Sequence, residues 1–265
     1  MTIESIKDLN QIAYPAIDRC IYCGSTNRLE KEHIVPYALN GSAVLPNSTC
    51  RECAKITGQF EQSVLRGPMW GVRVLRKLKS RTKHSDAPQT FPLSIIQDGE
   101  EKEIQVPLEE YPVLLHFPTF SPPGYMVPNE YTSGITLTGV ATILFGPRPE
   151  EVAKILGVTE LNHAQDYYPA AFARTIAKIG YSYAVAEGAL GRLQGKPLLL
   201  DSLLGRTDDI GRWVGTLAQP LQSHSGLLHR LAIHEDHEKN LLIVEVQLFA
   251  DSQTPSYDII VGHLK

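Results

Sequence analysis

The chain reads CIYCGS at residues 20–25, EHIVPYALNG at 32–41 and LPNSTCRECAKITGQFE at 45–61, and these motifs decide the fold of its N-terminal part. All four cysteines of the 265 residues lie in them, as the CxxC pairs Cys20/Cys23 and Cys50/Cys53. Two such pairs are typical of one zinc ion held by four thiolates. The 26 residues between the pairs leave room for a β-hairpin that contains His33. We therefore predict a structural zinc site beside a candidate catalytic histidine, the simpler alternative being a zinc knuckle that only holds the fold.

Composition indicates a globular protein of a reducing compartment. The chain is 43% hydrophobic and 20% charged, which is enough apolar material for a core in one large domain or two smaller ones. It begins without a basic segment followed by an apolar run, and it has no uninterrupted run of about 18 apolar residues. We therefore expect no secretory signal, no membrane contact and a cytoplasmic location. There, paired CxxC motifs favour metal binding over disulfides.

The charge distribution points to one local basic surface. The net charge of −4 argues against a protein that coats nucleic acid over its whole surface. Residues 64–84 nevertheless contain no Asp or Glu, and Val72, Leu75 and Leu78 form an apolar stripe at helical spacing. A solvated amphipathic helix is one interpretation, and contact with nucleic-acid phosphates is the other. The predicted phosphate-binding residues are Arg66, Arg73, Arg76, Lys77, Lys79 and Arg81.

The order of elements predicts an α+β fold. A strand is expected over residues 31–35, a return strand from 44–45, a helix over 51–65 and a basic helix to about 79. The polar stretch 85–90 is the expected boundary between an N-terminal module, 1–84, and an α+β domain, 85–265, with a role in assembly, sensing or DNA contact. In this second domain we expect strands at 93–97, 103–106, 113–117, 135–145, 228–234, 241–249 and 257–261, and helices at 149–156 and 168–190. The charged segment 235–240 is expected to be a solvated hairpin turn.

Together these motifs resemble the HNH endonuclease family, in its ββα-metal form with a four-cysteine zinc knuckle. The resemblance covers about a sixth of the chain, residues 20–62. It implies that His33 is the general base that activates water for attack on a phosphodiester. It also implies that Glu32 binds a divalent cation, Mg²⁺ or Mn²⁺, which stabilises the phosphate and the leaving oxygen. Asn47 is expected to tie its loop to the strand that carries the histidine.

One position departs from the family pattern. The residue after the last cysteine is usually Asn or His and is the second protein ligand of the cation, but here it is Ala54, whose methyl group cannot bind a metal. Three explanations stay open: an engineered inactive variant, a ligand supplied by another residue such as Glu61 or Thr57, or a naturally degenerate module. Glu61 would sit two turns further along the helix, about 10 Å along its axis.

Two hypotheses about function follow. The first is a divalent-metal-dependent DNA endonuclease, or an inactivated form of one, with a role in restriction or anti-phage defence by analogy with other nuclease modules that carry long tails. A homodimer or a protein partner would suit cleavage of both strands. The second is a non-catalytic, zinc-stabilised module that binds nucleic acid or protein, with the main function in the C-terminal domain.

Overall fold

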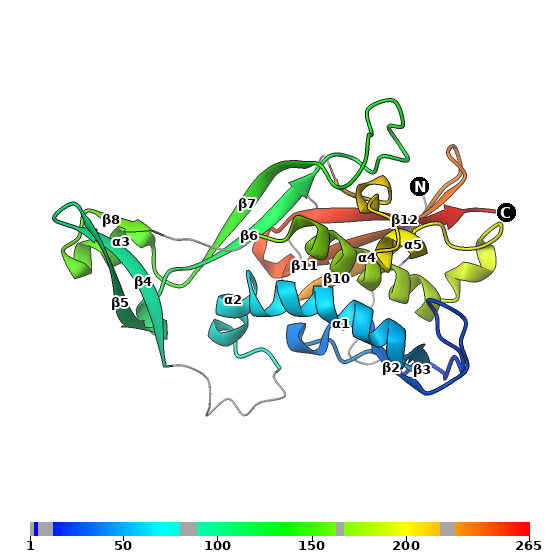
Figure 1. Ribbon diagram of the computed structural model, residues 1–265, viewed down its shortest axis with the longest axis horizontal. Helices are drawn as coiled ribbons and strands as arrows, with labels where there is room; N and C mark the ends of the chain where they lie inside the picture. Colours follow the sequence, from blue (N-terminus) through cyan, green and yellow to red (C-terminus); the bar gives the residue numbers. More distant parts are fainter. Residues whose placement is uncertain (1–2, 5–12, 80–88, 163–166, 218–225) are drawn as a thin grey trace.

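The N-terminal module folds as a β-hairpin followed by a helix (Figure 1). A computed structural model describes residues 3–4, 13–79, 89–162, 167–217 and 226–265. Strands β2 (Leu29–His33) and β3 (Val44–Cys50) pair antiparallel, with the 3-10 turn η2 (Tyr37–Leu39) between them and helix α1 (Arg51–Arg66) directly after β3. The predicted hairpin and helix are therefore confirmed, although β2 begins two residues before the expected strand.

Helix α1 has the sequence features of a helix that lies on a core. Its buried residues Cys53, Thr57, Phe60 and Val64 recur at helical spacing and form one face. Glu52 lies in its first turn and Arg66 in its last, so both charges complement the helix dipole. The buried face orients the helix against β2 and β3, and fixes the direction in which Cys53 points.

The basic segment after α1 is less regular than expected. Helix α2 (Trp70–Leu75) ends four residues before the predicted position, and Lys77 adopts a left-handed backbone with φ of 50°. A non-glycine residue in that region interrupts a helix. Arg81 and the core of the predicted domain boundary, residues 85–88, lie outside the described residues.

The C-terminal half is built on a five-stranded antiparallel sheet with the order β1-β10-β11-β12-β9. Helix α4 (Pro169–Ala186) packs on strands β9 to β12 and also contacts α1 (Figure 1). The strands are β1 (Ile3–Glu4), β9 (Val214–Thr216), β10 (His229–Asp236), β11 (Leu241–Leu248) and β12 (Ser256–His263). Shorter helices follow α4 or flank the sheet: η5 (Ala189–Arg192), α5 (Leu200–Leu203), η6 (Ile210–Arg212) and η7 (Ala250–Ser252).

A two-stranded ribbon connects this body to a small lobe at one end of the molecule (Figure 1). The ribbon consists of β6 (Val113–Phe120) and β7 (Leu137–Phe145). The lobe, residues 90–110 and 149–162, contains β4 (Thr90–Gln97), β5 (Glu100–Pro107), η4 (Leu108–Glu110), α3 (Pro149–Leu156) and β8 (Glu160–Asn162). Asp98 and Gly99 both have positive φ, 57° and 80°, as a two-residue type I′ hairpin turn requires.

Two separate hydrophobic clusters are formed. The smaller one lies in the lobe and contains Leu93, Ile95, Val106 and Val152. The larger one joins the N-terminal module to the C-terminal sheet: it runs from Cys20 to Leu264. Residues from both sides of the expected boundary therefore share one core. None of the described helices has the length and apolar character needed to cross a lipid bilayer.

Candidate functional site

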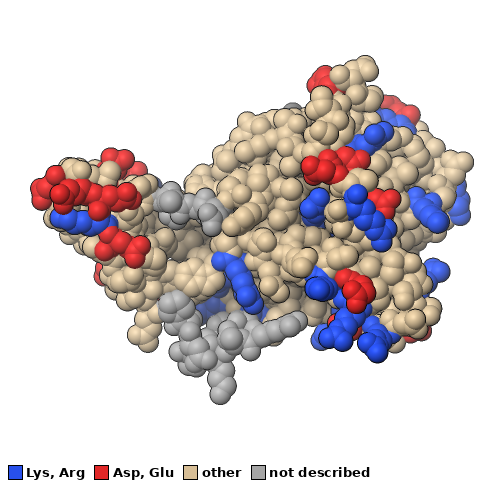
Figure 2. Space-filling model, viewed as in Figure 1, with Lys and Arg blue, Asp and Glu red and all other residues tan. Residues whose placement is uncertain are grey.

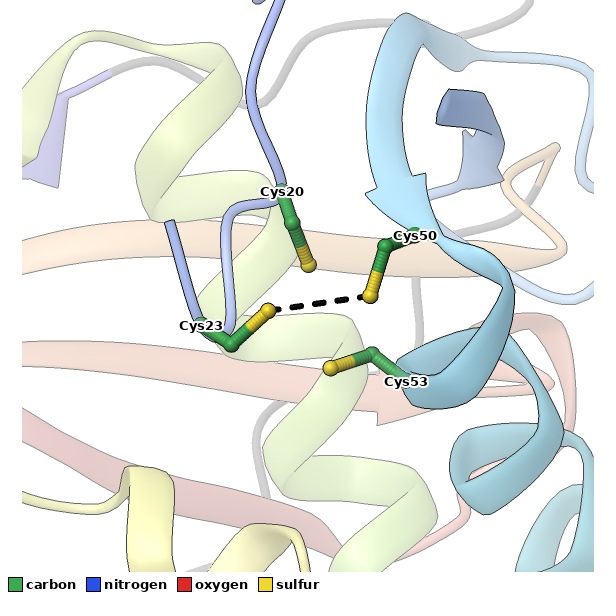
Figure 3. Close-up of side chains that lie close together, drawn as sticks. All are labelled: Cys20, Cys23, Cys50 and Cys53. Atoms are coloured by element: carbon green, nitrogen blue, oxygen red, sulfur yellow. Dashed lines mark hydrogen bonds between the residues drawn. The ribbon is translucent and has the colours of Figure 1, made fainter. Parts of the chain in front are cut away.

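The four cysteines meet at the base of the N-terminal module (Figure 3). Cys20 and Cys23 lie in the turn before β2, Cys50 ends β3, and Cys53 lies in the first turn of α1. Their Sγ atoms are all within 4.8 Å of one another, and the Sγ atoms of Cys23 and Cys50 are 3.6 Å apart. Thiolates around a tetrahedral zinc are about 3.8 Å apart, given Zn–S bonds of about 2.3 Å. With no disulfide among the four, the cluster fits a structural zinc.

The surroundings of the cysteines stabilise a thiolate before any metal binds. Burial raises the pKa of Cys20, but backbone N–H groups of Cys50, Cys23 and Tyr22 that point at its sulfur outweigh burial and lower the pKa to about 7. In Cys53 burial dominates and raises the pKa of the thiol. A zinc ion bound here would keep all four sulfurs deprotonated and would fasten the turn before β2 to the start of α1.

His33 ends strand β2, at the position expected for the general base. It is half-buried, it pairs with Val44 across the hairpin, and its ring lies 5.6 Å from the ring of Tyr37. The loop that follows is tightly folded: a Cβ atom at Gly41 would lie 1.8 Å from the carbonyl oxygen of Val35, so glycine is required there. The pairing with Val44 and the tight loop at Gly41 therefore hold the backbone around His33.

Glu32 points into the protein and pairs with a lysine from the C-terminal half. Its carboxylate lies 2.7 Å from Nζ of Lys178, on helix α4, and Glu61 of α1 lies 3.0 Å from the same ammonium group. Lys178 also donates a hydrogen bond to the backbone carbonyl of His33. The side chain of Lys178 is 1% exposed and that of Glu32 is 8% exposed. Three chain segments that are distant in sequence therefore meet at one buried ammonium group.

The charges of the three side chains shift the pKa values of Lys178 and Glu61. Burial alone would lower the pKa of Lys178, but the two carboxylates outweigh it and raise the pKa above its usual value of 10.5. The pKa of Glu61 is raised, because burial and the charge of Glu32 together outweigh the attraction of Lys178. Lys178 therefore remains an ammonium cation at neutral pH.

In this arrangement the carboxylates predicted to bind a catalytic cation, or considered for that role, face a lysine. Ala54 offers a methyl group, and the carboxylates of Glu32 and Glu61 are bonded to Lys178. Thr57 is buried and donates its hydroxyl to the carbonyl of Ala54, at 3.3 Å. Both residues considered as substitutes for the missing ligand therefore contact other groups of the protein.

Asn47 lies in β3 with a left-handed backbone, φ of 48°, and an exposed side chain. Its amide donates a hydrogen bond of 2.9 Å to the carboxylate of Asp18. Asn47 thus fastens strand β3 to the segment that precedes Cys20, whereas the sequence predicted a tie to the strand of His33.

Some of the predicted phosphate-binding residues are exposed, and others contact groups of the protein itself. Arg66 and Lys77 are exposed. Arg73 donates to the backbone carbonyls of Ala38 and Leu65 at 3.0 and 2.7 Å, and Arg76 forms a two-pronged ion pair with Asp251. Lys79 lies over the ring of Tyr37 at 5.5 Å. Arginines whose N–H groups are already bonded inside the protein have fewer left for a phosphate.

Sequence reasoning missed the residues that the C-terminal half contributes to the module. Besides Lys178, Tyr181 donates its hydroxyl to the carbonyl of Ile21, and His229 bonds the carbonyl of Leu39 at 2.6 Å. One signal was available: Lys178 is the only charged residue between Thr175 and Ala186 of an apolar helix. A lone charge on a buried helix indicates a buried partner.

The hairpin, the helix and the cysteine cluster define a ββα module with a zinc knuckle. Residues 20–66 match the sequence profile of a family described as HNH endonuclease. This part of the chain is an HNH endonuclease module, and its function is of the nuclease type. Comparison with curated proteins and with solved structures gave no match.

Proposed function

We propose that this chain is an endonuclease that hydrolyses phosphodiester bonds of DNA, with His33 as the general base and with a cation site left incomplete by Ala54. The observation that carries the proposal is the place of His33 at the end of β2, in a ββα module built around four clustered cysteines. His33 is partly exposed, with its Nδ1 buried, and the backbone beside it is held by Lys178.

The chemistry assigned to His33 is proton abstraction. A neutral imidazole, with a usual pKa of roughly 6.5, accepts a proton from the water that attacks the phosphorus atom. Tyr37 packs against the ring and limits its rotation. A divalent cation, when bound, would supply charge stabilisation at the phosphate and at the leaving oxygen.

The surface charge indicates which part of the protein meets DNA. The lobe carries nine Asp and Glu residues and two Lys, and Figure 2 shows these acidic side chains gathered at one end. Most Lys and Arg on the same face lie on the main body, where the module is. We therefore place the DNA against the body, with Arg66 and Lys77 as phosphate contacts that carry no sequence information.

The test restores the missing ligand. The chain and its Ala54→Asn variant are incubated with supercoiled plasmid in Mg²⁺, Mn²⁺ or EDTA. We expect the variant to nick or linearise the plasmid, EDTA to stop it, and the original chain to be much slower. Adding His33→Ala to the variant should lower the rate about 100- to 10,000-fold, the usual contribution of a general base. A variant that cuts equally well without His33 would contradict the assignment.

A second candidate function is a zinc-stabilised module that binds without cutting. Two observations favour it: Ala54 has no donor atom, and Glu32 is bonded to Lys178. If neither the original chain nor the Ala54→Asn variant cuts the plasmid, this second function is favoured over the first. DNA affinity that falls steeply with salt would then indicate a phosphate-binding module. An absence of DNA binding at low salt would direct the search to a protein partner of the C-terminal half.

A further inference from the structure

We propose that Lys178 of helix α4 is a positioning residue of the nuclease site, and that Glu32 and Glu61 hold its ammonium group in place of a catalytic cation. The proposal rests on the proposed function insofar as it treats His33 as the general base. It assigns part of the nuclease site to the C-terminal half of the chain, which matches no part of the family profile.

Lys178 contacts three acceptor groups within this cluster, one through a hydrogen bond and two through ion pairs. An ammonium group has three N–H donors and no acceptor. The structure provides three acceptors: one carboxylate oxygen of Glu32, one of Glu61 and the backbone carbonyl of His33. Two of these acceptors neutralise the charge, and the third is the main chain of the proposed base. Lys178 thus connects helix α1, strand β2 and helix α4 at the residue that performs the chemistry.

The direction of the side chains separates Glu32 from the reacting face. Successive residues of a strand point to opposite sides. Glu32 is buried on the side of α4, whereas His33 is partly exposed, although its Nδ1 is buried. A cation held by the Glu32 carboxylate in this arrangement would therefore lie behind the strand, away from a phosphate that contacts the imidazole. Lys178 reaches the same carboxylate from behind and extends to the carbonyl of His33.

The free-energy cost of burying three charged groups favours a functional role for Lys178 over a purely structural one. Burying an ammonium and two carboxylates carries a desolvation cost of several kcal/mol per ion, and apolar residues of similar volume often replace such clusters without loss of stability. Several residues next to Lys178 on α4, such as Ile176 and Ile179, are apolar and buried. Methionine would fill the same space, but it could not hold the carbonyl of His33.

The experiment removes the charges without leaving any of them unpaired. In the Ala54→Asn background we compare the neutral triple variant Lys178→Met/Glu32→Gln/Glu61→Gln with an otherwise unchanged chain. The matched control is Arg230→Met/Glu245→Gln, which neutralises both partners of another buried ion pair, Arg230–Glu245 at 2.7 Å, on strands β10 and β11. Zinc content and circular dichroism report folding, and NMR of the labelled histidine rings reports the environment of His33.

We expect the neutral triple variant to keep its zinc and its fold, to shift the ring signals of His33, and to lose at least tenfold in kcat with KM changed less than twofold. Arg230→Met/Glu245→Gln should leave the His33 signals and kcat unchanged. Glu32→Gln alone should lower kcat without raising the Mg²⁺ concentration needed for half-maximal cleavage. A raised Mg²⁺ requirement would instead make Glu32 a cation ligand and overturn that part of the proposal.

Two further outcomes would overturn the role of Lys178. Unchanged His33 signals and unchanged kcat in the triple variant would make the cluster an ordinary ion pair of the core. Loss of zinc and fold in that variant would assign Lys178 to stability alone. If no form of the chain cuts DNA, the proposed nuclease function fails, and the NMR comparison still decides whether Lys178 positions His33.

Discussion

At the scale of single residues, His229 shows how the C-terminal half controls the loop after His33. His229 is partly buried; its Nε2 donates to the carbonyl of Leu39 at 2.6 Å, and its Nδ1 accepts the backbone N–H of Phe249 at 3.3 Å. This pattern requires a neutral ring with its proton on Nε2. Burial lowers the pKa of His229 from 6.5 to about 4.

A lowered pKa of a buried base makes the protein sensitive to acid. The unfolded chain takes up a proton near pH 6.5, whereas the folded protein does so only near pH 4, so the stability contributed above pH 6.5 is lost as the pH falls through 4. A shift of this size corresponds to at most about 3 kcal/mol. His229→Gln should therefore flatten the pH dependence of the free energy of unfolding between pH 7 and 4, as measured by urea denaturation. An equally steep dependence in His229→Gln would place the acid sensitivity in other groups.

Individual residues also show why the sequence did not predict part of the site. The motifs identify the cysteines and His33 because those residues follow short, fixed spacings. The partner of Glu32 lies 146 positions along the chain, at Lys178, and no local pattern indicates which of many lysines it is. His234 lies in β10, within the strand expected at 228–234, but the sequence did not indicate that it would be 5% exposed and 3.1 Å from Glu245 of the neighbouring strand. In both cases the side chain is buried against a partner on another element, which no short motif predicts.

At the scale of elements, predictions succeeded where local signals are strong. Helix α3 has the expected bounds, Pro149–Leu156, because a proline occupies its first turn and Gly157 ends it in a left-handed conformation. The β4–β5 hairpin follows from its Asp98-Gly99 turn. The basic segment is not one long helix, because α2 ends at Leu75 and Lys77 has a left-handed backbone with φ of 50°.

The zinc knuckle is the element whose removal should have the largest effect. It joins the turn at Cys20 to the first turn of α1 at Cys53, and the larger hydrophobic cluster contains both residues. Cys53→Ser, or a strong chelator, should remove one zinc per chain and cost several kcal/mol, which for a protein of this size lowers Tm by about 10 °C or more. Metal analysis and calorimetry measure both effects.

The control for this prediction is Ser25→Ala, in the same turn. The Ser25 hydroxyl accepts only the backbone N–H of Asn27 among the described residues, and its carbonyl, which bonds the N–H of Cys20, is kept by alanine. This variant should retain zinc and Tm. A chelator that leaves Tm unchanged would mean that the four cysteines do not hold a structural metal.

At the scale of the whole molecule, the surface charge and the hydrophobic clusters divide the chain into parts other than those that the sequence motifs predict. The acidic lobe has its own small cluster and projects from the body through the β6–β7 ribbon (Figures 1 and 2). The nuclease module, in contrast, shares its core with the C-terminal sheet and helix α4. Under the proposed function, we expect the acidic lobe to repel DNA and the body, where the module and the C-terminal half share one core, to meet it.

Shared packing predicts that the module does not fold by itself. A fragment of residues 13–79 keeps the four cysteines, the hairpin and α1, but loses the contacts of α4 with α1. Glu32 and Glu61 would then lack Lys178, and the carbonyl of Leu39 would lack His229. We expect the fragment with zinc to give a poorly dispersed NMR spectrum, and the dispersion to return when residues 89–265 are added as a separate chain. A fragment that folds alone with the stability of the full chain would show instead that α4 is dispensable for the module, and it would support a boundary near residue 85.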